Sequence, residues 1–156
     1  MYNNGVSKKP TQNRTVLMSG TGHFAVQELN PYSDIRKQPK PFQASQEHLA
    51  IKAALETAGI EVITVAEPPD CQDGVYTANW ALCRGDTAVL SSLPNKRQAE
   101  EAYAEKYLRE QGKKIIKAPY RFSGQGDALP CGDLLFCRST CRTDQKMHDF
   151  LPKPLG

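Results

Sequence analysis

The stretch DGVYTANWALCRGDTAVLSSL, residues 73–93, contains two β-rich runs on either side of a short turn. Residues 75–83 and 87–93 are rich in apolar, aromatic and β-branched side chains, which is typical of strands. The tripeptide RGD, residues 84–86, lies between the two runs, and its glycine suits a tight turn. The stretch therefore predicts a β-hairpin.

Helix and strand signals alternate on both sides of this hairpin. The strands that we expect are residues 15–19, 61–65, 114–117, 127–129 and 134–137. The helices that we expect are residues 45–58 and 96–111, with a third that starts around Thr143. Gly59 and Gly112 can adopt the left-handed conformation that ends the first two helices. Pro152 and Pro154 are expected to prevent the third helix from continuing.

The first of these helices has a clear apolar pattern. Ser45 offers an N-cap, and apolar residues recur downstream at helical spacing: Ile51, Ala54, Leu55 and Ala58. The pattern predicts an amphipathic helix over residues 45–58.

Some features of the chain recur after about 50 residues, a period typical of supersecondary units that stack on one another. Gly59 and Gly112 stop the two helices, while Asp73 and Asp127 each precede an expected strand. If the strand entrances face a common axis, these two carboxylates converge. Convergent acidic groups at such a mouth suit a small cationic ligand.

The composition limits the class of protein. The chain has 156 residues and a net charge of +3, with basic residues scattered among acidic ones, so we expect no nucleic-acid groove. No apolar run approaches the ~20 residues that span a bilayer, and residues 1–10 lack the apolar stretch of a signal peptide. We therefore expect a cytoplasmic protein without a membrane partner. Residues 1–14 are expected to be a disordered tail and residues 15–156 the folded domain.

Five cysteines occur without a CxxC pair, which favours buried thiols over a disulfide framework or a zinc site. They are Cys71, Cys83, Cys131, Cys137 and Cys141. We expect no metal and no cofactor.

Five segments resemble, in order, motifs of one enzyme family. DGVYTAN, residues 73–79, resembles the PDxVFTAN motif of dimethylarginine dimethylaminohydrolase-like and arginine dihydrolase-like members of the pentein superfamily, which modify guanidino groups. The other matches are HF with LNPY (residues 23–32) to DHF…INPxM, residues 90–101 to LSRF…ERQGEEP, FSGQGDAL (residues 122–129) to FEGAGDAL, and RTD (residues 142–144) to FRTD or FRSE. Only the N-terminal half of the family pattern is covered.

The resemblance implies an α/β propeller of five ββαβ modules, of which about two and a half are present here. In the family a cysteine attacks the guanidinium carbon, which leads to C–N hydrolysis through a thiouronium intermediate, and a histidine acts as general acid and base. These two residues belong to later modules, and none of His23, His48 and His148 matches the family histidine. We therefore expect this chain to contain no catalytic residue, with Asp127 as a possible remaining carboxylate of the site.

The resemblance also implies a set of substrate-binding residues. Asn79 matches the residue that holds the guanidino group, and Asn30 matches a substrate-contacting asparagine. Arg97 and Arg142 match arginines that bind the substrate carboxylate, where a planar fork suits better than lysine. A guanidinium must be oriented by paired acceptors, so the expected site residues are Asn30, Asp73, Asn79, Arg97, Asp127 and Arg142.

Simpler roles remain open for several of these residues. Asp73 and Asp127 could merely cap turns. Arg97 begins a helix beside Glu100 and Glu101, where a solvated ion pair is a common arrangement.

The chain also departs from the family pattern at two positions. Ser123 stands where FEGAGDAL members carry a glutamate, and Gly22 replaces the aspartate of DHF. Serine cannot supply the negative charge that helps to position a guanidinium. Both changes remove an acid from the expected pocket.

Three functions remain open at this point. The first is the N-terminal portion of a guanidino hydrolase for arginine or dimethylarginine, inactive alone. The second is a binding module that pairs with itself or with a complementary C-terminal half. The third is an amidinotransferase-type member with a different guanidino substrate.

Overall fold

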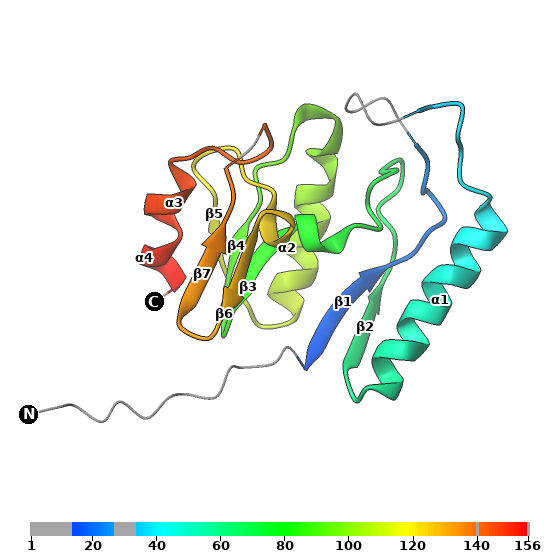
Figure 1. Ribbon diagram of the computed structural model, residues 1–156, viewed down its shortest axis with the longest axis horizontal. Coiled ribbons are helices and arrows are strands. Elements are labelled where there is room, and N and C mark those ends of the chain that lie inside the picture. Colours follow the sequence, from blue (N-terminus) through cyan, green and yellow to red (C-terminus); the bar gives the residue numbers. More distant parts are fainter. Residues whose placement is uncertain (1–13, 27–33, 140, 156) are drawn as a thin grey trace, which may run out of the picture.

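The computed structural model describes residues 14–26, 34–139 and 141–155, and its elements form three units side by side (Figure 1). In the first unit, β1 (Thr15–Ser19) pairs in parallel with β2 (Glu61–Val65). Helix α1 (Pro41–Thr57) connects these strands and lies against them at the edge of the molecule.

The second unit is a three-stranded sheet with one helix. Strands β3 (Ala81–Arg84) and β4 (Thr87–Leu90) form an antiparallel hairpin, and β5 (Lys114–Lys117) pairs in parallel with β4. Helix α2 (Ala99–Glu110) connects β4 to β5 and lies between this sheet and the first unit (Figure 1).

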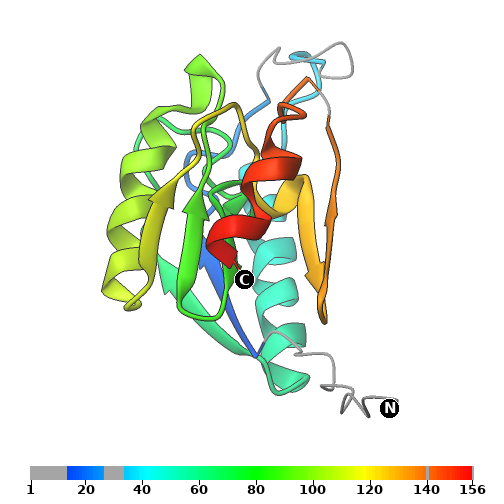
Figure 2. The same cartoon turned by 90° about the vertical axis from the view of Figure 1, so that its left-hand side faces the viewer.

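The third unit begins with another antiparallel hairpin, formed by β6 (Ala128–Cys131) and β7 (Leu134–Cys137). Two short helices follow, α3 (Met147–Phe150) and α4 (Pro152–Leu155). Figure 2 shows these helices between the second sheet and the β6–β7 hairpin, where Met147 and Leu151 are fully buried.

The β3–β4 hairpin is covered on both faces. Because successive side chains of a strand point to opposite sides, its two faces contribute to two separate clusters. Ala88 and Leu90 pack with α2 and the first unit. Leu82 and Val89 pack with Phe122 and the third unit. The hairpin therefore holds the three units together.

The strands at residues 15–19, 61–65, 114–117 and 134–137 are confirmed, as is the hairpin turn at Gly85. The strand expected at residues 127–129 runs over Ala128–Cys131 instead. The strand expected at residues 75–83 is wrong in its first half, because Thr77–Asn79 forms a 3₁₀ turn. There the backbone N–H groups of Asn79 and Trp80 bond to carbonyls three residues earlier, which closes the chain into a turn.

The helices differ from the expected ones in their bounds. Helix α1 begins four residues before Ser45, at Pro41, whose fixed φ favours the first helical position. Helix α2 begins at Ala99, after a 3₁₀ turn at Asn95–Arg97. The third helix begins at Met147 rather than near Thr143. It ends at Phe150, before the two prolines, as expected, and both prolines lie within a separate short helix, α4. Proline is tolerated in a first helical turn because the N–H groups there have no helical partner.

The apolar stripe expected on α1 is the clearest error. Ile51 is 56% exposed, Ala54 and Ala58 are exposed as well, and Phe42 is 78% exposed. Leu55 is the one residue of the expected stripe that is partly covered, as are the polar side chains of His48 and Lys52. Only a narrow two-stranded sheet lies beneath α1, so most of the helix surface faces outward.

The expected repeat is confirmed at the helix ends and wrong at the carboxylates. Gly59 and Gly112 both have positive φ just after a helix. Asp127, however, directly precedes β6 as Trp80 directly precedes β3, so the counterpart of Asp127 is Trp80 and not Asp73. The segment between β2 and β3 is longer than that between β5 and β6, which shifts the register. Within the described ranges, no helix is long and apolar enough to cross a membrane.

Corresponding positions of the two hairpins provide a test of this packing. Leu82 of β3 is 0% exposed, whereas Leu129, at the same position of β6, is 56% exposed. We predict that Leu82→Ala lowers the free energy of unfolding by about 2–5 kcal/mol, because it leaves a cavity between the second and third units. Leu129→Ala is the matched control and should cost less than about 1 kcal/mol. Urea denaturation measures both values, and equal losses would contradict the described core.

Candidate functional site

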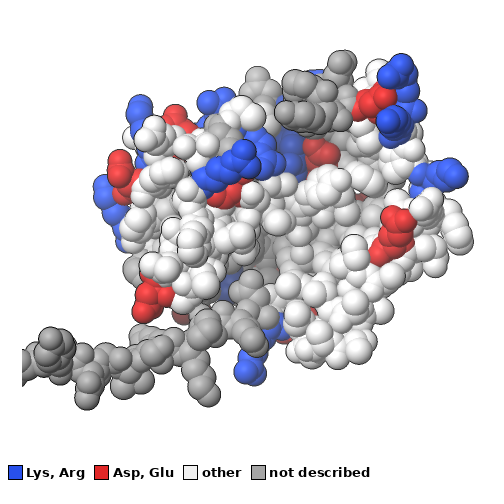
Figure 3. Space-filling view, in the orientation of Figure 1, with Lys and Arg blue, Asp and Glu red and all other residues white. Residues whose placement is uncertain are grey.

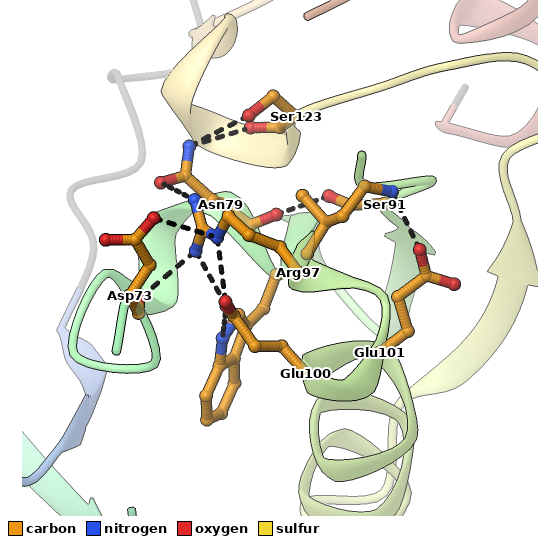
Figure 4. A network of polar contacts seen from close by, with 9 residues as sticks. Asp73, Asn79, Ser91, Arg97, Glu100, Glu101 and Ser123 are labelled. Atoms are coloured by element: carbon orange, nitrogen blue, oxygen red, sulfur yellow. Dashed lines mark hydrogen bonds and ion pairs between the residues drawn. The ribbon is translucent and has the colours of Figure 1, made fainter. Parts of the chain in front are cut away.

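Three of the six expected site residues lie at one end of the second unit, where three loops meet. One loop carries Asp73 and Asn79, another leads into α2 at Arg97, and a third carries Ser123. Figure 4 shows these side chains pointing toward one another. The 3₁₀ turn at Thr77–Asn79, which the strand prediction missed, aims Asn79 inward.

A buried ion pair lies at the centre of this cluster. The Arg97 Nε donates to Glu100 Oε1 at 2.7 Å, and Nη2 donates to Oε2 at 2.6 Å. The indole N–H of Trp80 also donates to Oε2, at 3.1 Å. Glu100 is 1% exposed, so these donors replace water around its carboxylate.

The same guanidinium reaches two of the expected acceptors. Arg97 Nη1 donates to Asn79 Oδ1 at 3.2 Å, and Nη2 donates to the backbone carbonyl of Asp73 at 3.1 Å. Among the described residues, these bonds leave at most one of the five N–H donors of Arg97 for a ligand. Arg97 is therefore a buried structural cation as well as a candidate ligand contact.

The Asp73 carboxylate is held less tightly. Its Oδ2 lies 3.7 Å from Arg97 Nε, a contact between charges, and within the described ranges no donor hydrogen-bonds to this carboxylate. Burial raises the pKa of Asp73, and the charge of Glu100 raises it further, while Arg97 opposes the shift. The pKa of the neighbouring Tyr76 phenol is also raised, first by burial and then by the charge of Asp73.

Asn79 connects this cluster to the third loop. Its Nδ2 donates to Ser123 Oγ at 3.0 Å and to the Ser123 carbonyl at 3.3 Å. Because Oδ1 accepts from Arg97, the orientation of the Asn79 amide is determined from both sides. A Cβ at Gly126 would collide with Nδ2, so the backbone can approach Asn79 closely only as glycine.

A second ion pair continues from Ser123. Thr143 Oγ1 accepts from the Ser123 N–H at 3.2 Å and donates to Asp127 Oδ2 at 2.7 Å. The other carboxylate oxygen of Asp127 accepts from Arg142 Nη2 at 2.6 Å. A continuous path of hydrogen bonds thus leads from Glu100 to Arg142.

The two positions that depart from the family pattern differ in their outcome. Ser123 is buried and accepts from Asn79, but it brings no charge. At Gly22, the side chain of Glu67 occupies the space that a Cβ would fill. The carboxylate of Glu67, in the segment after β2, therefore lies in the space that the aspartate side chain of the family pattern would enter.

Five of the six expected site residues are described. Asp73, Asn79 and Arg97 contact one another, and Asp127 and Arg142 join them through Ser123 and Thr143. Asn30 lies outside the described residues. The cluster of Arg97, Glu100, Asp73, Asp127 and Arg142 carries one more negative than positive charge, which suits a monovalent cation.

Sequence reasoning missed several members of this network. Glu100 lies three residues after Arg97, and this spacing indicated an ion pair between them. The sequence suggested a solvated pair, whereas the structure buries it. Trp80, Thr143 and Glu67 had no local signal, because their contacts come from distant segments.

The cysteines offer no activated thiol at this site. All five are free, and Cys71 is the buried one nearest the motif. Burial raises the pKa of Cys71, and the charges of Glu100 and Asp70 raise it further. Burial also raises the pKa of Cys83 and of Cys137. A nucleophilic thiol needs a lowered pKa, so these environments favour the protonated form.

Comparison with known proteins identifies relatives along nearly the whole chain, although no family model matches it. A dimethylarginine dimethylaminohydrolase of Mycobacterium tuberculosis is 27% identical over 155 residues, covering 96% of this chain and 50% of that protein. A bifunctional arginine dihydrolase/ornithine cyclodeaminase of Synechocystis, ArgZ, is 29% identical over 146 residues, covering 88% of this chain and 20% of that protein. The chain thus spans half or less of these curated relatives.

Solved structures agree with these relatives. The N-terminal domain of the cyanobacterial arginine dihydrolase ArgZ, as a cysteine-to-serine variant bound to its substrate, superposes with a TM-score of 0.83 and 26% identity. The match covers 90% of this chain and 54% of that domain. The ordered motifs, the fold and these relatives agree. The chain belongs to the pentein superfamily of guanidino-group modifying enzymes, and it matches the N-terminal half of the dimethylarginine dimethylaminohydrolase-like and arginine dihydrolase-like members of that superfamily.

Proposed function

We propose that this chain forms the substrate-binding part of a guanidino hydrolase that acts on arginine or a methylated arginine. The observation that carries the proposal is the pair of acceptors at Asp73 and Asn79, joined by the buried Arg97. A guanidinium needs planar, paired acceptors to be oriented for attack on its carbon. The relatives named above support this substrate class, since they are named for dimethylarginine or arginine chemistry.

In this proposal the site residues have distinct roles. Asp73 supplies the charge that balances the guanidinium, and Asn79, with Asn30, orients its nitrogens. Arg142 lies at the partly exposed end of the network and faces the carboxylate of an amino-acid substrate, assisted by the remaining donor of Arg97. Asp127 holds Arg142 in place at 2.6 Å.

The same proposal assigns residues 15–156 to an incomplete pentein domain of about two and a half ββαβ modules. The tail expected at residues 1–14 lies, up to residue 13, outside the described residues. The second unit has the full order of one module, β3–β4–α2–β5. The first unit resembles a module without its first strand, and the third resembles one without its last strand. All five cysteines are free, which supports a reducing, cytoplasmic location.

The exposed face of the β6–β7 hairpin supports the proposal that a partner packs against it and completes the domain. Leu82 and Val89 are covered by the third unit, but their counterparts Leu129 and Phe136 are 56% and 61% exposed. On the face shown in Figure 3, uncharged side chains also cover much of α1. Contiguous exposed apolar side chains are typical of interfaces. A complementary half of the domain is the partner that we propose.

We predict that the purified 156-residue chain binds L-arginine without converting it. Asp73→Asn should weaken binding by at least about tenfold, because one charge-assisted contact is lost. Asp133→Asn, at an exposed turn, is the control and should leave affinity unchanged. Calorimetry measures binding, and assays for citrulline and ammonia measure turnover. Cysteine-dependent product formation by this chain alone would contradict the proposal.

The raised pKa of Asp73 predicts how replacing this carboxyl group changes the pH dependence of folding stability. A carboxyl whose pKa is raised by folding binds more protons in the folded state, so its contribution to stability declines as pH rises above its unfolded pKa, about 4. Asp73→Asn should therefore make the chain relatively more stable at pH 7 than at pH 4, compared with the unmodified chain. Urea denaturation at both pH values measures the difference. A change in the opposite direction would mean that Arg97 outweighs burial at this site.

The proposed interaction with a complementary half of the domain can be tested with a separately produced polypeptide. A separately produced polypeptide that corresponds to the C-terminal half of a relative should bind this chain, and Phe136→Glu should weaken that association at least tenfold by placing a charge in the apolar contact. Ile35→Glu, a similarly exposed site in the loop before α1, is the control. Analytical ultracentrifugation measures the complex. Association that survives Phe136→Glu unchanged would place the interface elsewhere.

A further inference from the structure

Arg97 lies between two carboxylates that hold it unequally. Glu100 binds it through two parallel hydrogen bonds of 2.7 and 2.6 Å. The Asp73 Oδ2 lies 3.7 Å from the same Nε that donates to Glu100, and Arg97 makes no hydrogen bond to the Asp73 carboxylate. Figure 4 shows Arg97 with Glu100 on one side and with Asp73 and Asn79 on the other. One cation thus serves two anions, and the geometry assigns it mainly to Glu100.

Three features of the fold explain why Glu100 prevails over Asp73. Glu100 is on the first turn of α2, where the helix dipole favours a negative charge. The Trp80 indole N–H adds a third donor to its carboxylate. The side chain of Glu100 is 1% exposed and that of Asp73 is 15% exposed, so the pair with Glu100 is better shielded from water.

Without Glu100, Arg97 would be left as a buried cation. An uncompensated buried charge is strongly unfavourable, so the guanidinium would turn to the next available anion. That anion is Asp73, whose Oδ2 is already 3.7 Å from Nε. A bidentate pair between Arg97 and Asp73 would then neutralise the carboxylate that a cationic ligand requires.

We propose that Glu100 is a positioning residue that keeps Arg97 away from Asp73, so that the Asp73 carboxylate remains available to a guanidinium ligand. Because Arg97 Nη1 donates to Asn79 Oδ1, the same pair also fixes the orientation of the Asn79 amide. The identity of the ligand rests on the proposed function. The division of Arg97 between two carboxylates does not depend on any ligand.

The other titratable groups near Asp73 do not take over the role of Glu100. The Tyr76 phenol and the Cys71 thiol lie in the same environment, and the pKa of each is raised, so both are neutral at pH 7. Among the described residues, Arg97 and Glu100 are the charged groups that influence the Asp73 carboxyl, in opposite directions. The state of Asp73 therefore depends on how closely Glu100 holds Arg97.

The test measures the pKa of the Asp73 carboxyl by NMR in three variants of the full 156-residue chain. Glu100→Gln removes the charge, and Glu100→Asp keeps the charge but is too short for the same bidentate pair. If Glu100 acts by holding Arg97, both variants lower the Asp73 pKa by about one unit or more and weaken L-arginine binding at least tenfold. Glu101→Gln is the matched control on the same helical turn, where Oε1 accepts from the Leu93 N–H, and it should change neither value.

The outcomes separate this inference from its alternatives. An Asp73 pKa that falls in Glu100→Gln but not in Glu100→Asp would mean that Glu100 acts by its charge alone, and the proposal would be wrong. A lower folding stability with an unchanged Asp73 pKa would overturn it as well. If Glu100→Gln does not fold, Trp80→Phe loosens Glu100 without changing any charge and should lower the Asp73 pKa in the same direction. A lowered pKa in a chain that never binds arginine would support the role of Glu100 and contradict the proposed ligand.

Discussion

The buried pair of Arg97 and Glu100 is the interaction on which the site depends. Removing two charges from water costs several kcal/mol per ion, and only close geometry with further hydrogen bonds offsets that cost. Here the bonds come from Trp80, from Asn79 and from the Asp73 backbone, so the pair ties residues 73–80 to the start of α2. The conformation of the DGVYTAN loop is therefore linked to the first turn of α2.

The fold supports this pair through the hairpin next to it. Trp80 directly precedes β3 and its ring lies in the cluster that includes Ala81, Leu90 and the inner side of α2. The same residue thus anchors the apolar core and donates to Glu100. Because both faces of the hairpin are covered, its position is determined from two sides, and the loop that leads into it is determined with it.

Sequence reasoning succeeded where local signals were sufficient. Strands at residues 15–19 and 61–65 are rich in apolar and β-branched side chains, and the turn at Gly85 needs a residue that accepts positive φ. Sequence reasoning failed at residues 75–83 and on α1, where tertiary contacts determine the backbone conformation and the burial of side chains. A 3₁₀ turn replaced half of the expected strand, and the apolar side of α1 faces outward. Neither outcome can be read from periodicity, because periodicity does not reveal which neighbours are present.

The candidate site shows the same division between local and distant information. Motif order selected Asp73, Asn79 and Arg97, which do meet, but it could not reveal that Arg97 is already engaged by Glu100. The substitution at Ser123 has a further consequence. Its hydroxyl accepts from Asn79 and so preserves the orientation of that amide, while the negative charge of the family glutamate is absent. Under the proposed function, the charge beside Asn79 that balances a guanidinium is then that of Asp73, because the charge of Glu100 is matched by Arg97. A site with one such carboxylate depends more strongly on keeping it unpaired than a site with two.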